Sequence, residues 1–317
     1  MTENLKVFIL EHTNADEISS VQLIQNLWSG YGQMLSVSLR GSDLKSVVVK
    51  AINLTEVEKH PRGWNTDIGH ERKLKSYKVE KHWYEHYSTN SRSRLPKSLG
   101  TQQTSDNIFI LLEDLDAAGY PFRKQTLDWN TFSSCLKWLA EFHVSFLGIE
   151  PEGLWPIGTY WHLDTRPQEL EQVEDEILRS SAKLMDTKLN ACRFKTLVHG
   201  DAKIANFCFS EDGDVAGVDF QYVGGGCGMK DLAYFAGSCL TEKDCEGLET
   251  KILDTYFQYF HQAYGKTHYE LEQEWRSLYR VAWADFHRFL KGWSPDHWKI
   301  NSYSERVTNE VIKNLNR

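Results

Sequence analysis

The amino-acid sequence predicts an α+β protein with a small N-terminal lobe built on an antiparallel sheet and a larger, mainly helical C-terminal lobe. Short β-branched runs separated by glycine turns dominate the first part of the chain, and long amphipathic stretches dominate the rest. The length of 317 residues exceeds the size at which a single core usually stops growing. We therefore expect two lobes, residues 1–116 and 117–317, with the break marked by Gly119-Tyr120-Pro121.

A glycine turn near residue 30 separates the first two predicted elements. Residues Glu17 to Trp28 have a helical or mixed pattern of apolar positions. Gly30 and Gly32 lie in the turn, and the alternating residues Met34 to Leu39 predict a strand.

The next strand carries a lysine and precedes a helix that carries a glutamate. Ser46 to Ile52 is rich in valine and contains Lys50, which predicts a buried strand with a lysine near its end. Residues 69–88 combine helix formers with aromatic residues at helical spacing, and Glu80 lies within them.

A third buried strand leads into the lobe boundary. Asn107 to Leu112 is an apolar run that continues directly into Glu113, Asp114 and Leu115. These three residues form the predicted connection between the lobes.

The C-terminal part begins with helical patterns. Thr131 to Leu147 is strongly amphipathic. Residues 150–179 hold eight acidic side chains against two arginines, which predicts a loop and then a solvated helix starting near Pro167. From Lys230 onward the sequence is helical in pattern and rich in aromatic residues.

Three polar residues between these helices have the spacing of a phosphoryl-transfer site. Asp201 and Asn206 are five apart, so an aspartate that orients a hydroxyl and an amide that binds a metal can face one site. Two short strands joined by Asp212-Gly213 follow, and the second ends at Asp219, a further carboxylate suited to Mg²⁺.

The motifs resemble those of the aminoglycoside phosphotransferase and choline kinase family. The resemblance rests on His199-Gly200-Asp201 through Asn206, on Asp219-Phe220-Gln221 and on residues 158–162, and it extends from Trp28 to Trp298. The ecdysteroid-kinase-like branch is the most similar part of that family. The resemblance implies a protein-kinase-like bilobal fold, an ATP-dependent kinase with Mg²⁺, and ATP in the cleft between the lobes.

The resemblance also assigns roles in nucleotide binding. Lys50 would bind the α- and β-phosphates and pair with a helix carboxylate, either Glu80, which we favour, or Glu71. Gly30 and Gly32 would let the turn approach the phosphates. The remaining assignments are Glu113, Asp114 and Leu115 as the hinge beside adenine, Asn206 and Asp219 as metal ligands, Asp201 as the catalytic residue and Lys203 as a contact to the γ-phosphate.

Composition narrows the class of protein. The net charge of −8 argues against a nucleic-acid-binding face, and no apolar run approaches the length of a membrane-spanning helix. The six cysteines form no Cys-x-x-Cys pair, which argues against a zinc site and suits reduced thiols. We expect a cytoplasmic protein whose partner is a small-molecule alcohol.

The acceptor stays open at the level of sequence. C-terminal aromatic residues with Asp285 nearby would suit a choline-like cation, and the same rings would suit a sterol-like alcohol; an aminoglycoside is a third class. A protein kinase is disfavoured because Gly200 and Gln221 stand where those enzymes carry arginine and glycine. A non-catalytic nucleotide-binding protein is disfavoured because the motif residues are intact.

Overall fold

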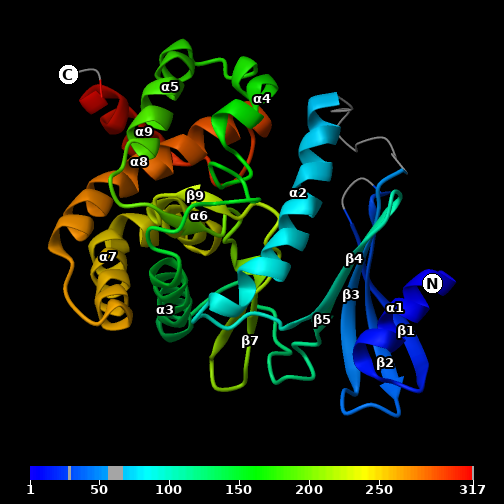
Figure 1. Cartoon of the computed structure of the whole chain (residues 1–317). Helices are drawn as coiled ribbons and strands as arrows, with labels where there is room; N and C mark the ends of the chain where they lie inside the picture. The colour runs from blue at the N-terminus through cyan, green and yellow to red at the C-terminus, as the bar shows by residue number, and fades with distance from the viewer. Residues whose placement is uncertain (28–29, 56–66, 316–317) are drawn as a thin grey trace. The chain divides into compact units, whose positions relative to one another are not determined.

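The computed structural model describes residues 1–27, 30–55 and 67–315 (Figure 1). It divides into two compact units. Unit 1 consists of Met1–Asn90, Arg94–Phe122 and Cys208–Gln221, and unit 2 of Ser91–Ser93, Arg123–Phe207 and Tyr222–Arg317. The segment Cys208–Gln221, which the sequence places after the catalytic motif, is thus part of unit 1.

Unit 1 is built on a five-stranded antiparallel sheet. The strands are in the order β1-β2-β3-β5-β4. Its strands and helices are β1 (Glu17–Asn26), β2 (Gly32–Arg40), β3 (Ser46–Asn53), β4 (Ser98–Gln103), β5 (Asn107–Glu113), α1 (Glu3–Thr13), α2 (Asp67–His86) and the 3₁₀ helix η2 (Ser88–Asn90).

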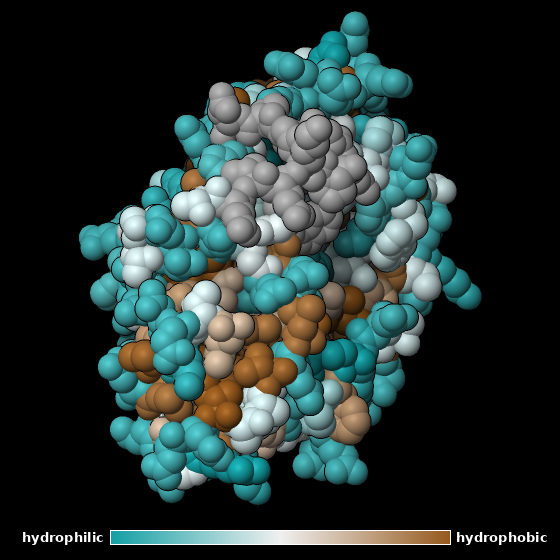
Figure 2. All heavy atoms as spheres, turned by 90° about the vertical axis from the view of Figure 1, so that its right-hand side faces the viewer, coloured by the Kyte–Doolittle hydropathy of each residue, from teal (hydrophilic) through white to brown (hydrophobic). Residues whose placement is uncertain are grey.

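The helical or mixed prediction for residues 17–28 is wrong, because the described part of this segment forms the edge strand β1. Val21 pairs with Val37 and Leu23 with Leu35 of β2, so the ladder with the neighbouring strand overrides a weak helical pattern. Trp28 lies outside the described residues. Figure 2 shows the face on the right-hand side of Figure 1, where apolar side chains gather in the lower half.

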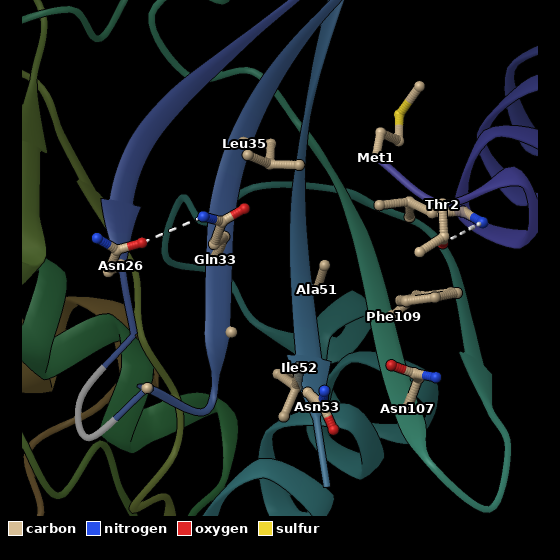
Figure 3. A pocket seen from close by; sticks show the side chains of 13 residues that line it. Met1, Thr2, Asn26, Gln33, Leu35, Ala51, Ile52, Asn53, Asn107 and Phe109 are labelled. Carbon is tan, nitrogen blue, oxygen red and sulfur yellow. Dashed lines mark hydrogen bonds between the residues drawn. The ribbon is translucent and has the colours of Figure 1, made fainter. Parts of the chain in front are cut away.

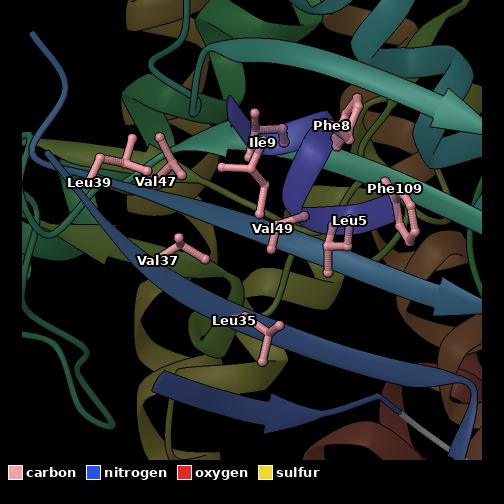
Figure 4. Packing of buried hydrophobic residues seen from close by; sticks show 10 residues of the cluster. Leu5, Phe8, Ile9, Leu35, Val37, Leu39, Val47, Val49 and Phe109 are labelled. Carbon is pink, nitrogen blue, oxygen red and sulfur yellow. The ribbon is translucent and has the colours of Figure 1, made fainter. Parts of the chain in front are cut away.

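Helix α1 covers one face of the sheet and forms the core of unit 1 (Figure 4). The Thr2 hydroxyl caps its first turn by accepting from the Leu5 amide at 3.4 Å. The buried side chains that meet here are Leu5, Phe8, Ile9, Leu35, Val37, Leu39, Val47, Val49, Phe109 and Leu111. Each such burial stabilises the fold by about 1.5–3 kcal/mol. Because strand side chains alternate, Lys50 faces the other side of the sheet from Val49.

Unit 2 is mainly helical. Its helices are α3 (Trp129–Ser145), α4 (Pro167–Glu171), α5 (Glu176–Asn190), α6 (Met229–Cys239), α7 (Glu242–Tyr264), α8 (Tyr269–Trp293), α9 (Ser302–Leu315) and the short η3 (Leu163–Thr165) and η4 (Ile204–Asn206). Helix α8 packs against α4, α5, α6 and α9. The Asp128 side chain caps α3 by accepting from the Thr131 amide at 2.8 Å.

Two small sheets flank the catalytic motif in sequence. Strands β7 (Phe207–Phe209) and β8 (Val215–Gly217) form the predicted hairpin, and β6 (Thr196–Val198) pairs with β9 (Gly224–Gly226). The three glycines of β9 have a buried backbone that pairs with β6.

The predicted α+β class is confirmed. The antiparallel sheet lies in unit 1 and most helices lie in unit 2. Over residues 1–27, 30–55 and 67–315, no helix combines the length and apolar character needed to cross a membrane.

Candidate active site

Lys50 is the centre of a buried charge cluster in unit 1. Its Nζ lies 2.6 Å from Glu80 Oε2 and 3.2 Å from Asp219 Oδ1. Burial by itself would lower the pKa of Lys50, but the carboxylates of Asp219 and Glu80 outweigh it and hold that pKa above its ordinary value. The structure therefore gives Lys50 a Glu80 partner on α2, while Glu71 is exposed. A cation held between two carboxylates is fixed in position and protonated.

Asp219 has a backbone conformation that few residues other than glycine adopt. Its φ is 72°, in the left-handed region, and such strain often occurs at functional positions. The Gln221 amide donates to Asp219 Oδ1 at 2.6 Å, and the Gln221 carbonyl oxygen accepts from Lys73 at 2.7 Å and from Ser76 at 3.2 Å. Gln221 therefore orients the carboxylate of Asp219 and connects it to α2.

Phe220 strengthens the same connection. Its ring stacks on Trp83 of α2 with centroids 4.7 Å apart and planes at 16°, and both side chains are fully buried. An offset aromatic pair of this kind contributes about 0.5–1.5 kcal/mol beyond its buried area. The Asp-Phe-Gln segment is thus attached to α2 by one stacked ring and one hydrogen-bonded amide.

The backbone of the predicted phosphate turn itself requires its two glycines. Gly32 has a φ of 133°, and a Cβ there would lie 2.0 Å from the Ala51 carbonyl oxygen. Gly30 has a φ of 75°, and its amide donates to the Leu27 carbonyl at 3.3 Å. Both residues are therefore required by the turn, whether or not a phosphate approaches it.

The side chains of the predicted hinge make contacts within unit 1. Glu113 pairs with Arg94 at 2.9 Å, and Asp114 Oδ2 accepts from the Ser46 hydroxyl at 2.6 Å. Leu115 is buried against Cys208 and Ala216. These contacts engage the side chains of the segment. The proposed contact with adenine is therefore left to its backbone groups.

A cavity of about 470 Å³ in unit 1 is lined in part by Leu35, Ala51 and Phe109 (Figure 3). Each of these three residues neighbours in sequence a residue that faces the Lys50 side, so they belong to the opposite face of the sheet. Gly30 and Gly32 of the predicted phosphate turn also line the cavity.

The predicted catalytic motif forms a second cluster, in unit 2. Asp201 is buried, and its carboxylate accepts from the Lys203 ammonium at 2.8 Å, from the Asn206 amide at 3.1 Å and from the Tyr234 hydroxyl at 3.0 Å. The Asn206 amide nitrogen also donates to the Asp201 carbonyl at 2.7 Å. Because the nitrogen of Asn206 is engaged with Asp201, its amide oxygen points elsewhere, as a metal ligand requires.

Asp231 of α6 holds the catalytic loop in shape. Its carboxylate accepts from the backbone amides of His199 at 2.6 Å and Gly200 at 2.9 Å, and it lies 3.1 Å from His143 Nε2. His199 Nδ1 accepts from the Asp201 amide at 3.3 Å. His199 and His143 therefore help to hold the loop and Asp231 in position.

Gly200 cannot be replaced without moving the loop. Its φ is 79°, and a Cβ would lie 2.1 Å from the Tyr222 carbonyl oxygen. This close approach gives a physical reason for glycine at the position where protein kinases carry arginine.

Asp285 does not serve as a partner for a bound cation. Its carboxylate is buried and accepts from Arg288 at 2.6 Å and from the Trp161 indole at 3.0 Å. The suggestion that Asp285 supports a choline-like acceptor is therefore wrong, since its charge is already compensated inside unit 2.

Three residues of the two clusters, Asp231, Tyr234 and Lys73, carry no signal in the sequence. Asp231 and Tyr234 lie about 30 positions after the loop residues that they contact, and Lys73 meets Gln221 across 148 positions. Gln221, which stands where protein kinases carry glycine, is the signal of this last contact.

A family model described as "Uncharacterized oxidoreductase dhs-27" matches residues 168–290, which include the catalytic motif and Asp219. No curated relative matches the sequence.

Solved structures resemble the whole chain. A Ralstonia eutropha JMP134 protein provisionally assigned as an aminoglycoside phosphotransferase aligns with a TM-score of 0.56 and 13% identity, over 99% of this chain and 96% of its own. The amicoumacin kinase hAmiN, solved with AMP-PNP, Ca²⁺ and Ami, aligns with 0.56 and 11%, over 99% and 93%. Aminoglycoside phosphotransferase APH(4)-Ia, solved with ADP and hygromycin B, aligns with 0.51 and 11%, over 98% of each chain. The resemblance inferred from the motifs is confirmed, and this chain has the fold of the aminoglycoside phosphotransferases and related small-molecule kinases.

Proposed function

We propose that the protein is a kinase that transfers the γ-phosphate of ATP to a hydroxyl group of a small molecule. The observation that carries the proposal is the pair of preformed clusters, Lys50–Glu80–Asp219 in unit 1 and Asp201–Lys203–Asn206 in unit 2. Phosphoryl transfer needs positioned cations, metal ligands and a carboxylate for the hydroxyl more than it needs covalent chemistry.

Each charged residue has a distinct task in this proposal. Lys50, held by Glu80, binds the α- and β-phosphates. Asp201 accepts a hydrogen bond from the acceptor hydroxyl and orients its oxygen for attack, and Lys203 carries positive charge toward the γ-phosphate. Tyr234 holds Asp201 Oδ1, which leaves the orientation of the carboxylate fixed.

Asp219 and Asn206 are the residues that would hold Mg²⁺. The Asp219 side chain is 31% exposed and the Asn206 amide oxygen is directed away from Asp201, so hard oxygen donors are available. When bound, Mg²⁺ neutralises negative charge on the phosphate oxygens.

An oxidoreductase activity is less well supported by the fold. The described part of residues 168–290 holds helices and short strands of three residues, with no parallel sheet of the dinucleotide-binding type. The name of the family model therefore does not change the proposal. A nucleotide-binding protein without catalysis is the alternative that experiment must separate from a kinase.

Calorimetric titration with AMP-PNP and Mg²⁺ tests the nucleotide site. We expect metal-dependent binding by the wild-type protein and its loss in Asp219→Ala. Asp254→Ala is the control, because Asp254 is an exposed aspartate paired with Arg276. Absence of wild-type binding, or equal binding by Asp219→Ala, would contradict the assignment.

ADP release in the presence of candidate alcohols tests the catalytic role of Asp201. We expect Asp201→Asn to lower turnover by roughly 10²–10⁴-fold and to keep nucleotide affinity, because the residue acts on the acceptor hydroxyl. Near-wild-type turnover in Asp201→Asn would rule out its catalytic role.

A further inference from the structure

An aromatic cage in unit 2 already contains a cation of the chain itself. Lys299 lies in the loop between α8 and α9. Its Nζ is 4.8 Å from the ring centroid of Tyr234, 5.3 Å from that of Phe286 and 5.7 Å from that of Trp298. All three distances are within the range of cation–π attraction. We refer to Tyr234, Phe286 and Trp298 as the cage.

The cage is connected to the catalytic residue. Tyr234 contributes its ring to the cage and its hydroxyl to Asp201 Oδ1, at 3.0 Å. Burial lowers the pKa of Lys299 to about 8, and the Asp201 carboxylate opposes this shift while the Lys203 ammonium adds to it. The Lys299 ammonium therefore lies in the electrostatic field of the acceptor end of the proposed site.

Lys299 has no carboxylate within ion-pair distance among residues 1–27, 30–55 and 67–315. Lys291, in the last turn of α8, provides a contrast because its Nζ lies 3.4 Å from Glu305 Oε1. A partly desolvated ammonium that is held by rings and not by a carboxylate can still bind an anionic or strongly polar group.

The Lys299 ammonium takes the position over the rings of the cage that a second cation would need. A tetraalkylammonium group could contact the same rings only by displacing the Lys299 side chain. It would also bring a second positive charge to the same rings, at a Coulombic cost.

We propose that Lys299 occupies the position that a cationic acceptor would take, and that the acceptor is therefore an uncharged or acidic alcohol whose polar group meets the Lys299 ammonium. The inference rests on the proposed kinase function and narrows its substrate class. It excludes choline-like alcohols, and it assigns Lys299 as a specificity-determining residue beside Asp201.

Titration with tetramethylammonium chloride, followed by calorimetry without nucleotide, tests the cage directly. We expect no saturable binding by the wild-type protein. Lys299→Ala and Lys299→Ser should bind saturably, with an affinity roughly 10-fold or more above the upper limit set by the wild-type titration, since both open the cage. Lys299→Met keeps the volume filled and Lys291→Ala removes a lysine elsewhere, so both should behave as wild type. Sodium chloride at equal concentration controls for ionic strength.

The outcomes separate this inference from the kinase assignment. Saturable binding by the wild-type protein would overturn it, whatever the variants do. Folded Lys299→Ala and Lys299→Ser proteins that fail to bind would also overturn it, because the rings would then form no cage. Loss of nucleotide binding or of ADP release would contradict the kinase function and leave these titrations unchanged.

Discussion

At the scale of single residues, the orientation of the Asp201 carboxylate depends on a tyrosine that no motif indicates. The Lys203 ammonium and the Asn206 amide both bind its Oδ2. The Tyr234 hydroxyl, on helix α6, binds its Oδ1 at 3.0 Å. Burial and the Asp201 charge raise the pKa of Tyr234 well above its ordinary value, so it remains a neutral hydrogen-bond donor.

Replacing Tyr234 by phenylalanine should therefore lower turnover more than stability. A hydrogen bond to a charged group contributes about 1.5–3 kcal/mol. If this energy serves to orient Asp201 for the reaction, its loss corresponds to a decrease in kcat of roughly 10–100-fold. The measurement is ADP release, with kcat and KM determined separately.

Tyr303→Phe is the matched control, because its hydroxyl also donates to a carboxylate, Glu249, at 3.0 Å in another part of unit 2. Equal kcat in Tyr234→Phe and Tyr303→Phe would show that Tyr234 does not position Asp201.

At the scale of elements, the catalytic loop is held by its backbone. Gly200 adopts a positive φ against the Tyr222 carbonyl, and Asp231 at the start of α6 accepts from two consecutive amides of the loop. The loop is therefore shaped by one glycine and one buried carboxylate. The polar side chains that it carries, including Asp201, depend on this geometry.

Gly200→Ala tests how much the close approach matters. We expect a loss in the free energy of unfolding clearly above the roughly 1–2 kcal/mol that positive φ alone costs an alanine, because the Cβ would also lie 2.1 Å from the Tyr222 oxygen. Urea denaturation measures the loss.

Gly265→Ala is the control, since Gly265 has a φ of 84° at the end of α7 and a Cβ there would meet nothing within 4 Å. Similar losses in the two variants would mean that the loop relaxes around the added carbon.

At the scale of the whole molecule, acid sensitivity should arise from a histidine remote from the catalytic motif. His287 of α8 is buried, its Nδ1 lies 2.7 Å from the Thr308 hydroxyl of α9, and its Nε2 has no protein partner among the described residues. Burial, with the nearby Lys291 ammonium, lowers the pKa of His287 to about 4, and the carboxylates of Glu305 and Asp175 oppose the shift. The native fold therefore holds this ring neutral.

The sign of the pH effect follows from that lowered pKa. The unfolded chain binds a proton at His287 below its ordinary pKa of about 6.5, while the native state does so only near 4. Its contribution to stability is thus complete above pH 6.5 and is lost as the pH falls toward 4, with a slope of up to about 1.4 kcal/mol per pH unit.

His287→Gln should flatten this decline, as measured by urea denaturation between pH 7 and pH 4.5. His86→Gln, at an exposed histidine, should leave the slope unchanged. An unaltered slope in His287→Gln would place the acid sensitivity elsewhere.

The sequence alone determined the fold class and most strands, and it placed the residues of the proposed catalytic motif on one loop, because those features depend on neighbours in the chain. Asp201, Lys203 and Asn206 share one loop, and the strand that carries Lys50 has a clear apolar pattern. The folded chain decided what contacts between separate segments control. Pairing with β2 makes residues 17–26 a strand, Glu80 and not Glu71 contacts Lys50, and Asp231, Tyr234 and Lys299 lie in the surroundings of Asp201. Each of these contacts joins two different segments and leaves no periodicity in either of them, so only the folded chain reveals it.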